Sequence, residues 1–381
     1  MKIMHIIPYL GGGGAEILLG SIAIEQVNRG CKVIVVILEP VHFTYINYPL
    51  KQELESKVTI YKIATRVRFS FLKNTIAEKY DEFENIIKEF KPDIIHSHLF
   101  SSELVSRFRI SASVRYFTHC HDNMHQFSFF TKKPLRRRFT DYLEKKWIIE
   151  KYKACNNTFI AISNHTQNYF IQNLPSSLKN RVCLLPNAIN TSLFFSNPEK
   201  ENLVNGIYRL VSVGNLVEKK GHSFLIDVMS ILVNDGVKVH LDVLGFGELQ
   251  EELQLKINQL FLSQHITLHG NVSNVNEFMS KAHIYLHAAI YEPFGLVLLE
   301  AMASGLPVVC TDGKGNKDLI TEGYNGFLLT ERNPEKYAQK VKYLVEEGQI
   351  RKEIGENALK FSKKYNIEAY TEKLFQLYHQ S

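Results

Sequence analysis

The stretch Tyr291–Val309 constrains the fold of this chain more than any other segment, because it contains the signals for a loop, a buried helix and a strand in turn. Pro293 suits the first turn of a helix, Gly305 suits a left-handed cap at its end, and the residues between them are almost all apolar. A helix that is apolar on every side is expected to lie buried against a sheet. Two glutamates, Glu292 and Glu300, stand at its start and inside it, with seven residues between them.

These two glutamates need binding partners if they are buried, because a buried carboxylate without a partner is rare. The amino end of the helix has unpaired backbone N–H groups and the positive end of the helix dipole, which suit a diphosphate. Glu292 and Glu300 would lie about 12 Å apart along a helix axis, so they would reach hydroxyl groups on the two sides of that diphosphate, as in a nucleotide-sugar. An internal salt bridge of Glu300 and a solvated Glu292 are an equal alternative.

The stretch resembles the E-x7-E signature of the retaining GT-B glycosyltransferases of family 4, also called glycosyl transferases group 1. The agreement extends through EAMASGLPVV, and weaker matches follow along nearly the whole chain. The resemblance implies an α/β fold in which two Rossmann-like, doubly wound parallel-sheet domains face an interdomain cleft. It also implies that Glu300 holds ribose hydroxyls, that Glu292 holds sugar hydroxyls, and that the backbone of Phe294, Gly295 and Leu296 binds the diphosphate.

Length and patterning independently favour two domains. A chain of 381 residues with 45% hydrophobic content exceeds what one core usually fills, and strands alternate with helices in both halves. The polar segment Asn197–Gly206 predicts a linker. We expect an acceptor-binding domain over 1–197 and a donor-binding domain over 207–365, with a last helix at about 366–381 that packs back on the first domain.

The charge of the chain is unevenly distributed. Residues 1–200 carry 27 Lys and Arg against 17 Asp and Glu, whereas residues 201–381 carry 18 against 22. The amino-terminal half is therefore the part expected to face an anionic partner. Five cysteines without CxxC spacing favour a reducing compartment, and no window approaches 18 consecutive apolar residues. We expect a cytoplasmic protein, with peripheral contact to the inner face of a membrane as an extension.

The amino terminus opens with an apolar strand over Lys2–Pro8, a run of four glycines and a helical pattern. Strand, glycine loop and helix are typical of a nucleotide-binding βα unit, in which the backbone approaches a phosphate closely. The spacing is not G-x-G-x-x-G, so a simple flexible turn is an equal alternative. The resemblance implies that Gly13 and Gly14 contact the donor and that Gly12 lies on the acceptor side.

Further along the first half, the pattern predicts a helix over Asn74–Phe90 and two strands that end in His-x-His. One pair is His96 and His98, and the other is His119 and His121. Because residues two apart on a strand share a face, a metal site of the amidohydrolase kind is an alternative, but no carboxylate ligand set accompanies it. The resemblance instead identifies His121 as an active-site residue near the transferred sugar, and leaves His119 as a structural histidine.

The second half restarts the alternation of strands and helices at about residue 208. The resemblance places Lys220 where the family binds phosphate, and a lysine there would stabilise a departing diphosphate. Asn215 stands where the family usually has arginine, which is a departure from the pattern. Gly245 and Gly247 resemble the donor loop of the family, and Val272 lies in the segment whose backbone meets the base.

A basic segment rich in aromatic residues precedes the end of the first domain. Nine basic residues lie between positions 131 and 153, against three acidic ones. Such a helix suits an anionic membrane surface or a lipid-linked phosphate, whereas a solvated face is the plainer alternative. No nucleic-acid motif accompanies the charge, so we expect no nucleic-acid partner. The candidate surface residues are Lys133, Arg136, Arg137 and Arg138.

Together these features predict a retaining glycosyltransferase that moves a sugar from a nucleoside diphosphate, with a UDP-sugar as the expected donor. The acceptor would be a glycan or a lipid-linked sugar in cell-envelope polysaccharide biosynthesis, and no metal or other cofactor is expected. His121, Glu292 and Lys220 are the expected catalytic residues. No carboxylate nucleophile is evident, so a same-face displacement is favoured. The alternatives are a sugar-nucleotide epimerase or phosphorylase on the same fold, and an inactive nucleotide-sugar-binding subunit.

Overall fold

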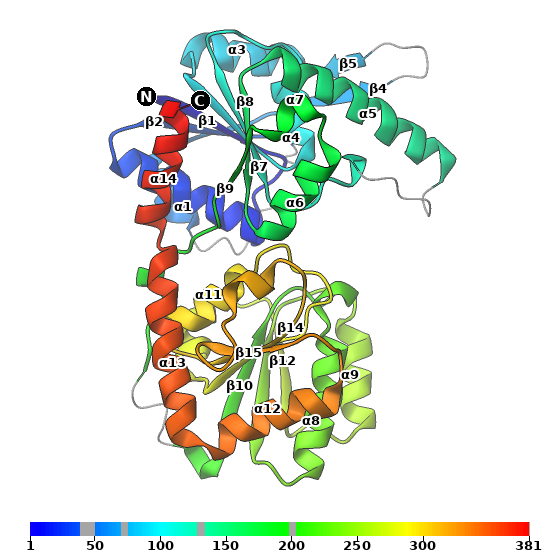
Figure 1. Cartoon of the computed structure of the whole chain (residues 1–381), viewed down its shortest axis with the longest axis vertical. Coiled ribbons are helices and arrows are strands. Elements are labelled where there is room, and N and C mark those ends of the chain that lie inside the picture. Colours follow the sequence, from blue (N-terminus) through cyan, green and yellow to red (C-terminus); the bar gives the residue numbers. More distant parts are fainter. Residues whose placement is uncertain (39–49, 70–74, 128–133, 198–202, 381) are drawn as a thin grey trace. The chain divides into compact units, whose positions relative to one another are not determined.

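A computed structural model describes residues 1–38, 50–69, 75–127, 134–197 and 203–380. The chain divides into two compact units, and each is described by itself. Unit 1 contains residues 1–187 together with 367–381, and unit 2 contains residues 188–366. Figure 1 shows that each unit has a central sheet with helices packed around it. The sequence prediction of two parallel-sheet, Rossmann-like domains is therefore confirmed.

Unit 1 is built on a parallel sheet with the strand order β3-β2-β1-β6-β7-β8-β9 in the described residues. Strands β1 and β2 are nearly continuous apolar runs, as expected for strands that are covered by helices on both faces. A separate antiparallel pair, β4 and β5, lies beside this sheet. The strands are β1 (Lys2–Ile7), β2 (Lys32–Ile37), β3 (Thr59–Lys62), β4 (Arg66–Phe69), β5 (Thr75–Glu78), β6 (Ile94–His98), β7 (Arg115–Cys120), β8 (Asn157–Ala161) and β9 (Val182–Leu184).

The helices of unit 1 include the last helix of the chain, which lies against the first one (Figure 1). Arg29 at the end of the first helix donates to the carbonyl oxygen of Glu368 at 2.7 Å, and Gln26 Nε2 donates to the Tyr378 hydroxyl at 3.4 Å. The same hydroxyl lies 2.6 Å from His96 Nδ1 of β6. The helices are α1 (Gly14–Asn28), α2 (Lys51–Lys57), α3 (Tyr80–Phe90), α4 (Phe100–Ser106), α5 (Leu135–Ala154), α6 (Asn164–Asn173), α7 (Ser176–Lys179) and α14 (Ile367–Gln380).

A fully buried arginine, Arg107, ties α4 to the sheet of unit 1. Its guanidinium lies 3.3 Å from the carboxylate of Glu103 and donates to Asn157 Oδ1 at 2.6 Å. It also lies over the rings of Tyr116 and Tyr152. Burial raises the pKa of Glu103 to about 7, although the charge of Arg107 opposes that shift. This cluster is a buried polar network that joins α4 to β7, β8 and α5.

Unit 2 is a second parallel sheet with the order β12-β11-β10-β13-β14-β15 in its described residues. Its core is one apolar cluster formed by the sheet and helices α8, α9, α12 and α13. The strands are β10 (Tyr208–Val213), β11 (Val239–Leu244), β12 (Ile266–Gly270), β13 (Ile284–His287), β14 (Val308–Thr311) and β15 (Gly326–Leu329). The helices are α8 (His222–Asn234), α9 (Gln250–Gln259), α10 (Val275–Lys281), α11 (Leu296–Ala303), α12 (Pro334–Glu346) and α13 (Gly348–Ser362).

The strand order of unit 2 determines where a ligand site is expected. From β10 the chain proceeds to β11 and β12 on one side, then crosses to β13 on the other side. In open parallel sheets, ligands bind at the carboxyl ends of the strands, at the point where this order reverses. The loops that follow β10 and β13 are therefore the expected walls of a site in unit 2.

Two sequence expectations differ from the structure. Residues 75–78 form strand β5 instead of the start of a helix, because they pair with Arg66–Phe69, and the helix begins only at Tyr80. The first unit ends at residue 187, ten residues before the expected boundary. The segment after it belongs to unit 2, where the Ile189 N–H donates to the carbonyl oxygen of Tyr365 at 2.9 Å. Residues 198–202 of the expected linker lie outside the described residues.

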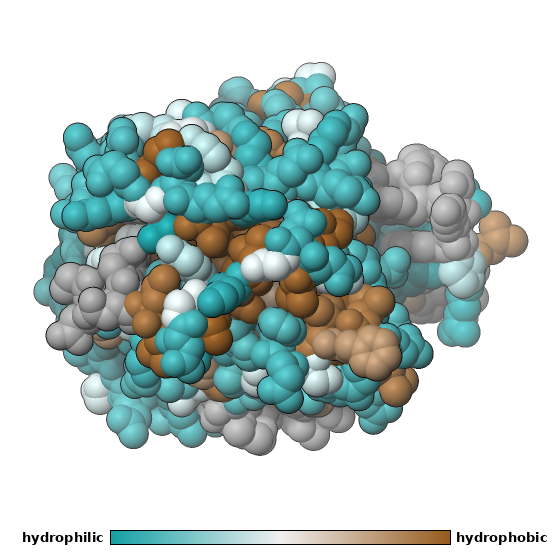
Figure 2. Space-filling view, turned by 90° about the horizontal axis from the view of Figure 1, so that it is seen from below, coloured by the Kyte–Doolittle hydropathy of each residue, from teal (hydrophilic) through white to brown (hydrophobic). Residues whose placement is uncertain are grey.

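The surface is mainly polar, and apolar side chains gather in limited areas on the face shown in Figure 2. Among the described residues, Phe246 and Phe261 of unit 2 are strongly exposed apolar side chains, as is Leu135 at the start of α5. All five cysteines are free thiols. Within the described ranges, we find no helix with the length and apolar character needed to cross a membrane.

The Arg107 cluster generates a test of what stabilises unit 1. Arg107→Met should lower the free energy of unfolding by about 3 to 5 kcal/mol, because it leaves Glu103 and several buried acceptors without their partner. Urea denaturation followed by circular dichroism measures the change. The matched control is Arg109→Met, since Arg109 pairs with Glu84 at 2.6 Å but is 58% exposed, and such a pair contributes at most about 1 kcal/mol. Equal effects of the two substitutions would contradict a structural role of the buried cluster.

Candidate functional site

The backbone of Glu292 is fixed by the loop that follows β14. The N–H of Glu292 donates to the carbonyl oxygen of Gly313 at 2.7 Å, and its own carbonyl accepts from the Gly315 N–H at 3.0 Å. A Cβ on Gly315 would overlap the carbonyl oxygen of Pro293, so the loops approach each other only because residue 315 is glycine. The loops after β13 and β14 therefore hold Glu292 at the carboxyl edge of the sheet.

The side chain of Glu292 forms an ion pair with Lys220, which lies in the loop after β10. Lys220 Nζ donates to Glu292 Oε2 at 2.6 Å, and His287 Nε2 lies 3.5 Å from the same oxygen. Burial by itself would raise the pKa of Glu292, but the His287 ring and the Lys220 ammonium outweigh it and lower the pKa to about 2. Glu292 is therefore ionised at neutral pH and balances the charge of Lys220.

Glu300, unlike Glu292, has no cationic neighbour among the described residues. It lies in the second turn of α11, half-buried, and its carboxylate has no hydrogen-bond or ion-pair partner in the part of the chain that the structure describes. Burial raises its pKa to about 7. Burial and then the charges of Glu300 and Glu292 also raise the pKa of Tyr285, so both carboxylates lie near one ring. An internal salt bridge, the plain alternative for Glu300, is absent among the described residues.

The amino end of α11 lies beside this pair of carboxylates. Gly295 precedes the helix with φ of 100°, a conformation that favours glycine, and the helix starts at Leu296 instead of Phe294. Phe294 is buried, so only its backbone is available to a ligand. The first N–H groups of a helix have no partner within that helix. Since residues 292–295 are not helical, the spacing expected for a continuous helix does not apply to Glu292 and Glu300.

The other expected donor residues of unit 2 lie in neighbouring loops at the same edge. Gly245 and Gly247 follow β11, and a Cβ at either would overlap a backbone carbonyl of the loop after β10. Asn215 is exposed in that loop, and Val272 follows β12. These glycines hold the loops after β10 and β11 together, whatever else they contact.

In unit 1, the glycine loop joins β1 to α1. Gly12, Gly13 and Gly14 are exposed, and Gly13 stands at the amino end of α1. A Cβ on Gly13 would overlap the carboxylate of Glu16, which is buried and whose pKa is raised by that burial. The loop therefore lies at the carboxyl edge of the unit 1 sheet, as the sequence predicts.

His121 follows β7 at the same edge of unit 1 and is 8% exposed. Its Nε2 lies 2.8 Å from His98 Nδ1, and its ring stacks on His119 at a centroid distance of 4.0 Å. The two His-x-His pairs do come together, and His5 of β1 joins them. Among the described residues, the histidine groups with metal-binding spacing contain no carboxylate.

The basic residues predicted for the acceptor or membrane surface lie at the start of α5, with one exception. Lys133 lies outside the described residues. Arg136 is exposed, Arg138 is half-buried, and Arg137 lies 3.1 Å from Asp141 in a surface ion pair. The amino end of α5 projects from the rest of unit 1 (Figure 1), and Leu135 beside the arginines is 79% exposed.

One cavity of unit 1 lies close to these residues. It has a volume of about 420 Å³ at the carboxyl ends of β1, β2 and β6. Its walls combine three arginines with apolar side chains, namely Arg66, Arg68, Arg137, Leu99, Phe100 and Leu104. Gln126, which is 6% exposed, also lines it, and its Oε1 atom has no hydrogen-bond partner among the described residues.

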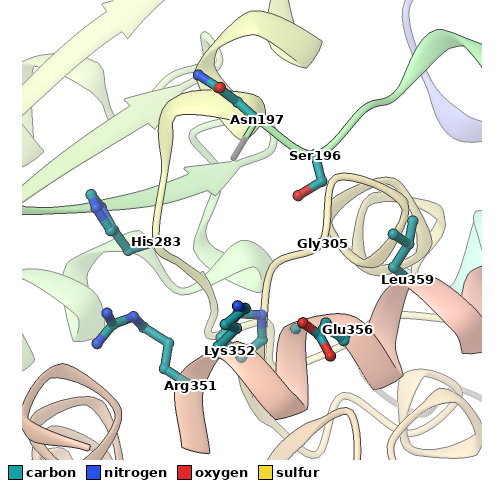
Figure 3. Close-up of a pocket in the computed structure, with 10 residues that line it drawn as sticks. Ser196, Asn197, His283, Gly305, Arg351, Lys352, Glu356 and Leu359 are labelled. Carbon is teal, nitrogen blue, oxygen red and sulfur yellow. The ribbon is translucent and has the colours of Figure 1, made fainter. Parts of the chain in front are cut away.

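Unit 2 has a second cavity, of about 270 Å³, shown in Figure 3. Arg351, Lys352 and Glu356 reach it from α13, and His283 and Pro307 line it just before β13 and β14. These positions place it at the amino ends of the strands, on the opposite edge of the sheet from Glu292. It is therefore separate from the carboxylate site.

Sequence reasoning missed His287, which ends β13 and contacts Glu292. A strand that ends in histidine just before the loop with Glu292 is the signal that was present, but the apolar run around it indicates only a buried strand. Reasoning from sequence also missed His222 at the start of α8, where burial lowers its pKa to about 4. Its ring lies next to Gly214, in the loop that leads to Lys220.

Two family models match the chain and together span residues 12–361. Residues 12–193 match the model described as Glycosyltransferase Family 4, and residues 194–361 match Glycosyl transferases group 1. An uncharacterized glycosyltransferase of Methanocaldococcus jannaschii is 27% identical over 338 residues, which cover 87% of this chain and 88% of that protein. The capsular polysaccharide biosynthesis glycosyltransferase CapM of Staphylococcus aureus is 27% identical over 247 residues, which cover 61% of this chain and 64% of CapM.

Solved structures agree with the fold. HepE of Anabaena, solved in complex with UDP-glucose, superposes with a TM-score of 0.79 at 19% identity and covers all of both chains. Sucrose-phosphate synthase from Thermosynechococcus elongatus superposes with a TM-score of 0.79 at 18% identity, over 100% of this chain and 98% of that one. At this level of identity the likeness shows the GT-B fold alone.

The buried histidines of unit 1 predict that its stability falls in mild acid. Burial lowers the pKa of His5 to about 4 and that of His119 to about 3, and lowers those of His96, His98 and His121 well below 6.5. The unfolded chain therefore binds more protons as the pH falls below 6.5, and each such histidine costs roughly 2 kcal/mol of stability at pH 5.

Glu103 has the opposite effect on stability. Because its pKa is raised in the folded state, it stabilises the folded state as the pH falls from about 7 to 4.5. The histidines outnumber it, so the net effect is a loss. Urea midpoints of unit 1 at pH 7.5 and pH 5, followed by hydrogen exchange, measure it. A midpoint that is unchanged or higher at pH 5 would contradict the neutral, buried state of these rings.

Proposed function

Because this chain belongs to the glycosyl transferases group 1 family, we propose that it transfers a sugar from a nucleoside diphosphate to an acceptor, with retention and without a metal. The observation that carries the proposal is the arrangement at the carboxyl edge of unit 2. Lys220 pairs with Glu292 at 2.6 Å, and Glu300 stands unpaired nearby in α11. A cation, an anion-binding helix end and two carboxylates are what a diphosphate flanked by two hydroxylated rings requires.

In this proposal each group has a separate role. Lys220 and the first N–H groups of α11 take the charge that develops on the departing diphosphate. Glu292, which stays ionised, accepts hydrogen bonds from sugar hydroxyls. Glu300 accepts from the two ribose hydroxyls, which would supply the partners that its carboxylate lacks. Asn215 offers no charge where the family usually has arginine, so Lys220 carries more of the electrostatic stabilisation here.

A UDP-sugar is the proposed donor, and the support comes from the fold shared with HepE, which was solved with UDP-glucose. The acceptor is proposed to be a glycan or a lipid-linked sugar of a cell-envelope polysaccharide. The name of CapM, which refers to capsular polysaccharide biosynthesis, supports this class. So does the unit 1 cavity, because arginines beside apolar walls suit an acceptor with a phosphate group and a lipid chain. Within unit 1, His121 and the loop Gly12–Gly14 are the residues proposed to contact the substrates.

The donor proposal predicts a thermal shift. UDP at about 100 times its dissociation constant should stabilise the wild type by roughly 2.7 kcal/mol, and GDP and ADP should do less. Glu300→Gln should lose most of that response, because the amide offers one acceptor in place of a carboxylate. Without nucleotide, the same variant should melt at or above the wild type, since it removes an unpaired, half-buried charge.

The matched control is Glu331→Gln, which alters an exposed surface glutamate that pairs with Lys336. It should keep the full nucleotide response. Failure of every nucleoside diphosphate to stabilise the wild type would contradict the donor proposal. A nucleotide response that is equal in Glu300→Gln and the wild type would remove Glu300 from the site.

The membrane part of the proposal predicts binding to anionic vesicles. Each arginine near such a surface contributes about 1 kcal/mol, so Arg136, Arg137 and Arg138 changed together to Ser should weaken binding on the order of 100-fold at low salt. Sedimentation with vesicles that contain phosphatidylglycerol measures it. The control changes three exposed lysines elsewhere, Lys360, Lys363 and Lys364, to Ser. Equal losses in both variants would mean that only net charge matters.

A further inference from the structure

Five histidines of unit 1 form one buried cluster at the carboxyl ends of three adjacent strands. His5 lies on β1, His96 and His98 lie on β6, and His119 and His121 lie on β7 and directly after it. The strand register places His5 beside His96 and His98 beside His119. Only His121 has a role in the proposed function, so the cluster behind it needs its own explanation.

Hydrogen bonds connect His121 to a glutamine deep in the unit. His121 Nε2 lies 2.8 Å from His98 Nδ1, and His98 Nε2 lies 3.0 Å from His5 Nδ1. The series of hydrogen bonds ends at Gln26 of α1, whose Oε1 lies 2.8 Å from His5 Nε2. Gln26 Nε2 in turn donates to the Tyr378 hydroxyl at 3.4 Å, which orients the amide.

The terminal acceptor, Gln26 Oε1, determines which nitrogen carries the proton in each histidine of this series of hydrogen bonds. Burial lowers the pKa of each of the three rings far below neutral, so each ring carries one proton and has one donor and one acceptor nitrogen. Gln26 Oε1 can only accept, so His5 donates from Nε2 and accepts at Nδ1. His98 must then donate from Nε2 and accept at Nδ1. By the same logic, the proton of His121 lies on Nε2.

From this geometry we infer that Gln26, His5 and His98 are positioning residues that hold His121 in the Nε2–H tautomer and present its Nδ1 as a hydrogen-bond acceptor. Nδ1 of His121 has no partner among the described residues, and the residue keeps 8% of its surface exposed. An acceptor nitrogen selects a hydroxyl group of a substrate sugar and disfavours a phosphate oxygen, which cannot donate. The inference rests on the proposed role of His121 in substrate binding.

Stacking fixes the plane of the His121 ring. His119 lies parallel to it at 4.0 Å between centroids and 13° between planes. His119 is itself held by Asn187, whose Oδ1 accepts from Nε2 at 3.3 Å. The hydrogen bond that His121 donates to His98 and this stacking together restrict both the rotation and the tautomer of His121.

The same rings have spacing compatible with two metal sites, one formed by His5, His96 and His98 and one by His98, His119 and His121. The geometry favours hydrogen bonds instead. The ring centroids of His98 and His121 are 5.1 Å apart, and those of His5 and His98 are 5.3 Å apart. With nitrogen–nitrogen distances of 2.8 and 3.0 Å, these separations mean that the two nitrogens of each contact lie on the line between the two ring centroids, as a hydrogen bond requires. A shared metal requires two lone pairs that converge at an angle, and it requires protons to leave His98 and His121.

Histidine-selective ¹⁵N labelling and two-bond ¹H–¹⁵N correlation spectra test the inference without any sugar donor, so a wrong donor assignment would not affect the result. In the wild type, His121 should be at least about ten parts Nε2–H to one part Nδ1–H. Gln26→Leu removes the terminal acceptor and should give a mixture of tautomers at His121. Gln26→Glu keeps an acceptor and should restore the wild-type tautomer, which a merely structural role of Gln26 would not explain.

His96→Gln is the matched control, because His96 is equally buried and bonds to Tyr378 but does not lie between Gln26 and His121. It should leave the tautomer unchanged. An Nδ1–H tautomer in the wild type would overturn the inference, as would an unchanged tautomer in a Gln26→Leu variant that melts normally. Addition of one equivalent of Zn²⁺ should leave the spectra unchanged, and stoichiometric loss of the His98 and His121 N–H signals would establish the metal site in its place.

Discussion

The ion pair between Lys220 and Glu292 is the interaction on which the proposed donor site of unit 2 depends. It joins the loops after β10 and β13, which border the point where the strand order reverses. The backbone of Glu292 is fixed separately by the loop after β14. Three loops from separate parts of the sequence therefore meet at one residue, Glu292. Removal of the Lys220 charge would leave Glu292 buried without this partner, which is more costly than the loss of a surface pair.

Burial alone does not distinguish a carboxylate that is proposed to bind a ligand from a structural one in this protein. Glu103 and Glu300 both have a pKa raised to about 7 by burial, but Glu103 bonds to Arg107, Thr118 and Tyr152. Glu300 has no such partners in the described part of the chain. Glu292 is also buried, yet its cationic neighbours lower its pKa to about 2. The useful distinction is whether the surrounding protein already satisfies the charge, because an unsatisfied carboxylate at the edge of a sheet is available to a ligand.

Much of the fold could be predicted because parallel strands that are buried on both faces have largely apolar sequences. The strand expected over Lys2–Pro8 is β1 over Lys2–Ile7, and the alternation expected to restart at about residue 208 does so with β10 at Tyr208. The helix expected over Asn74–Phe90 failed at its first residues, because pairing with Arg66–Phe69 converts Thr75–Glu78 into a strand. Pairing with a distant segment overrides local propensity, and no local pattern reports it.

The sequence by itself determined the two parallel-sheet domains, the glycine loops and the glutamates around α11, because these depend on periodicity and on residue types at fixed spacing. It also indicated that His119 and His121 share a face. Only the tertiary structure decided that Lys220 pairs with Glu292, that Glu300 is left unpaired, and that Gln26 and His5 stand behind His121. These contacts join residues that are tens of positions apart, and they exist only because parallel strands bring their carboxyl ends to one edge of a sheet.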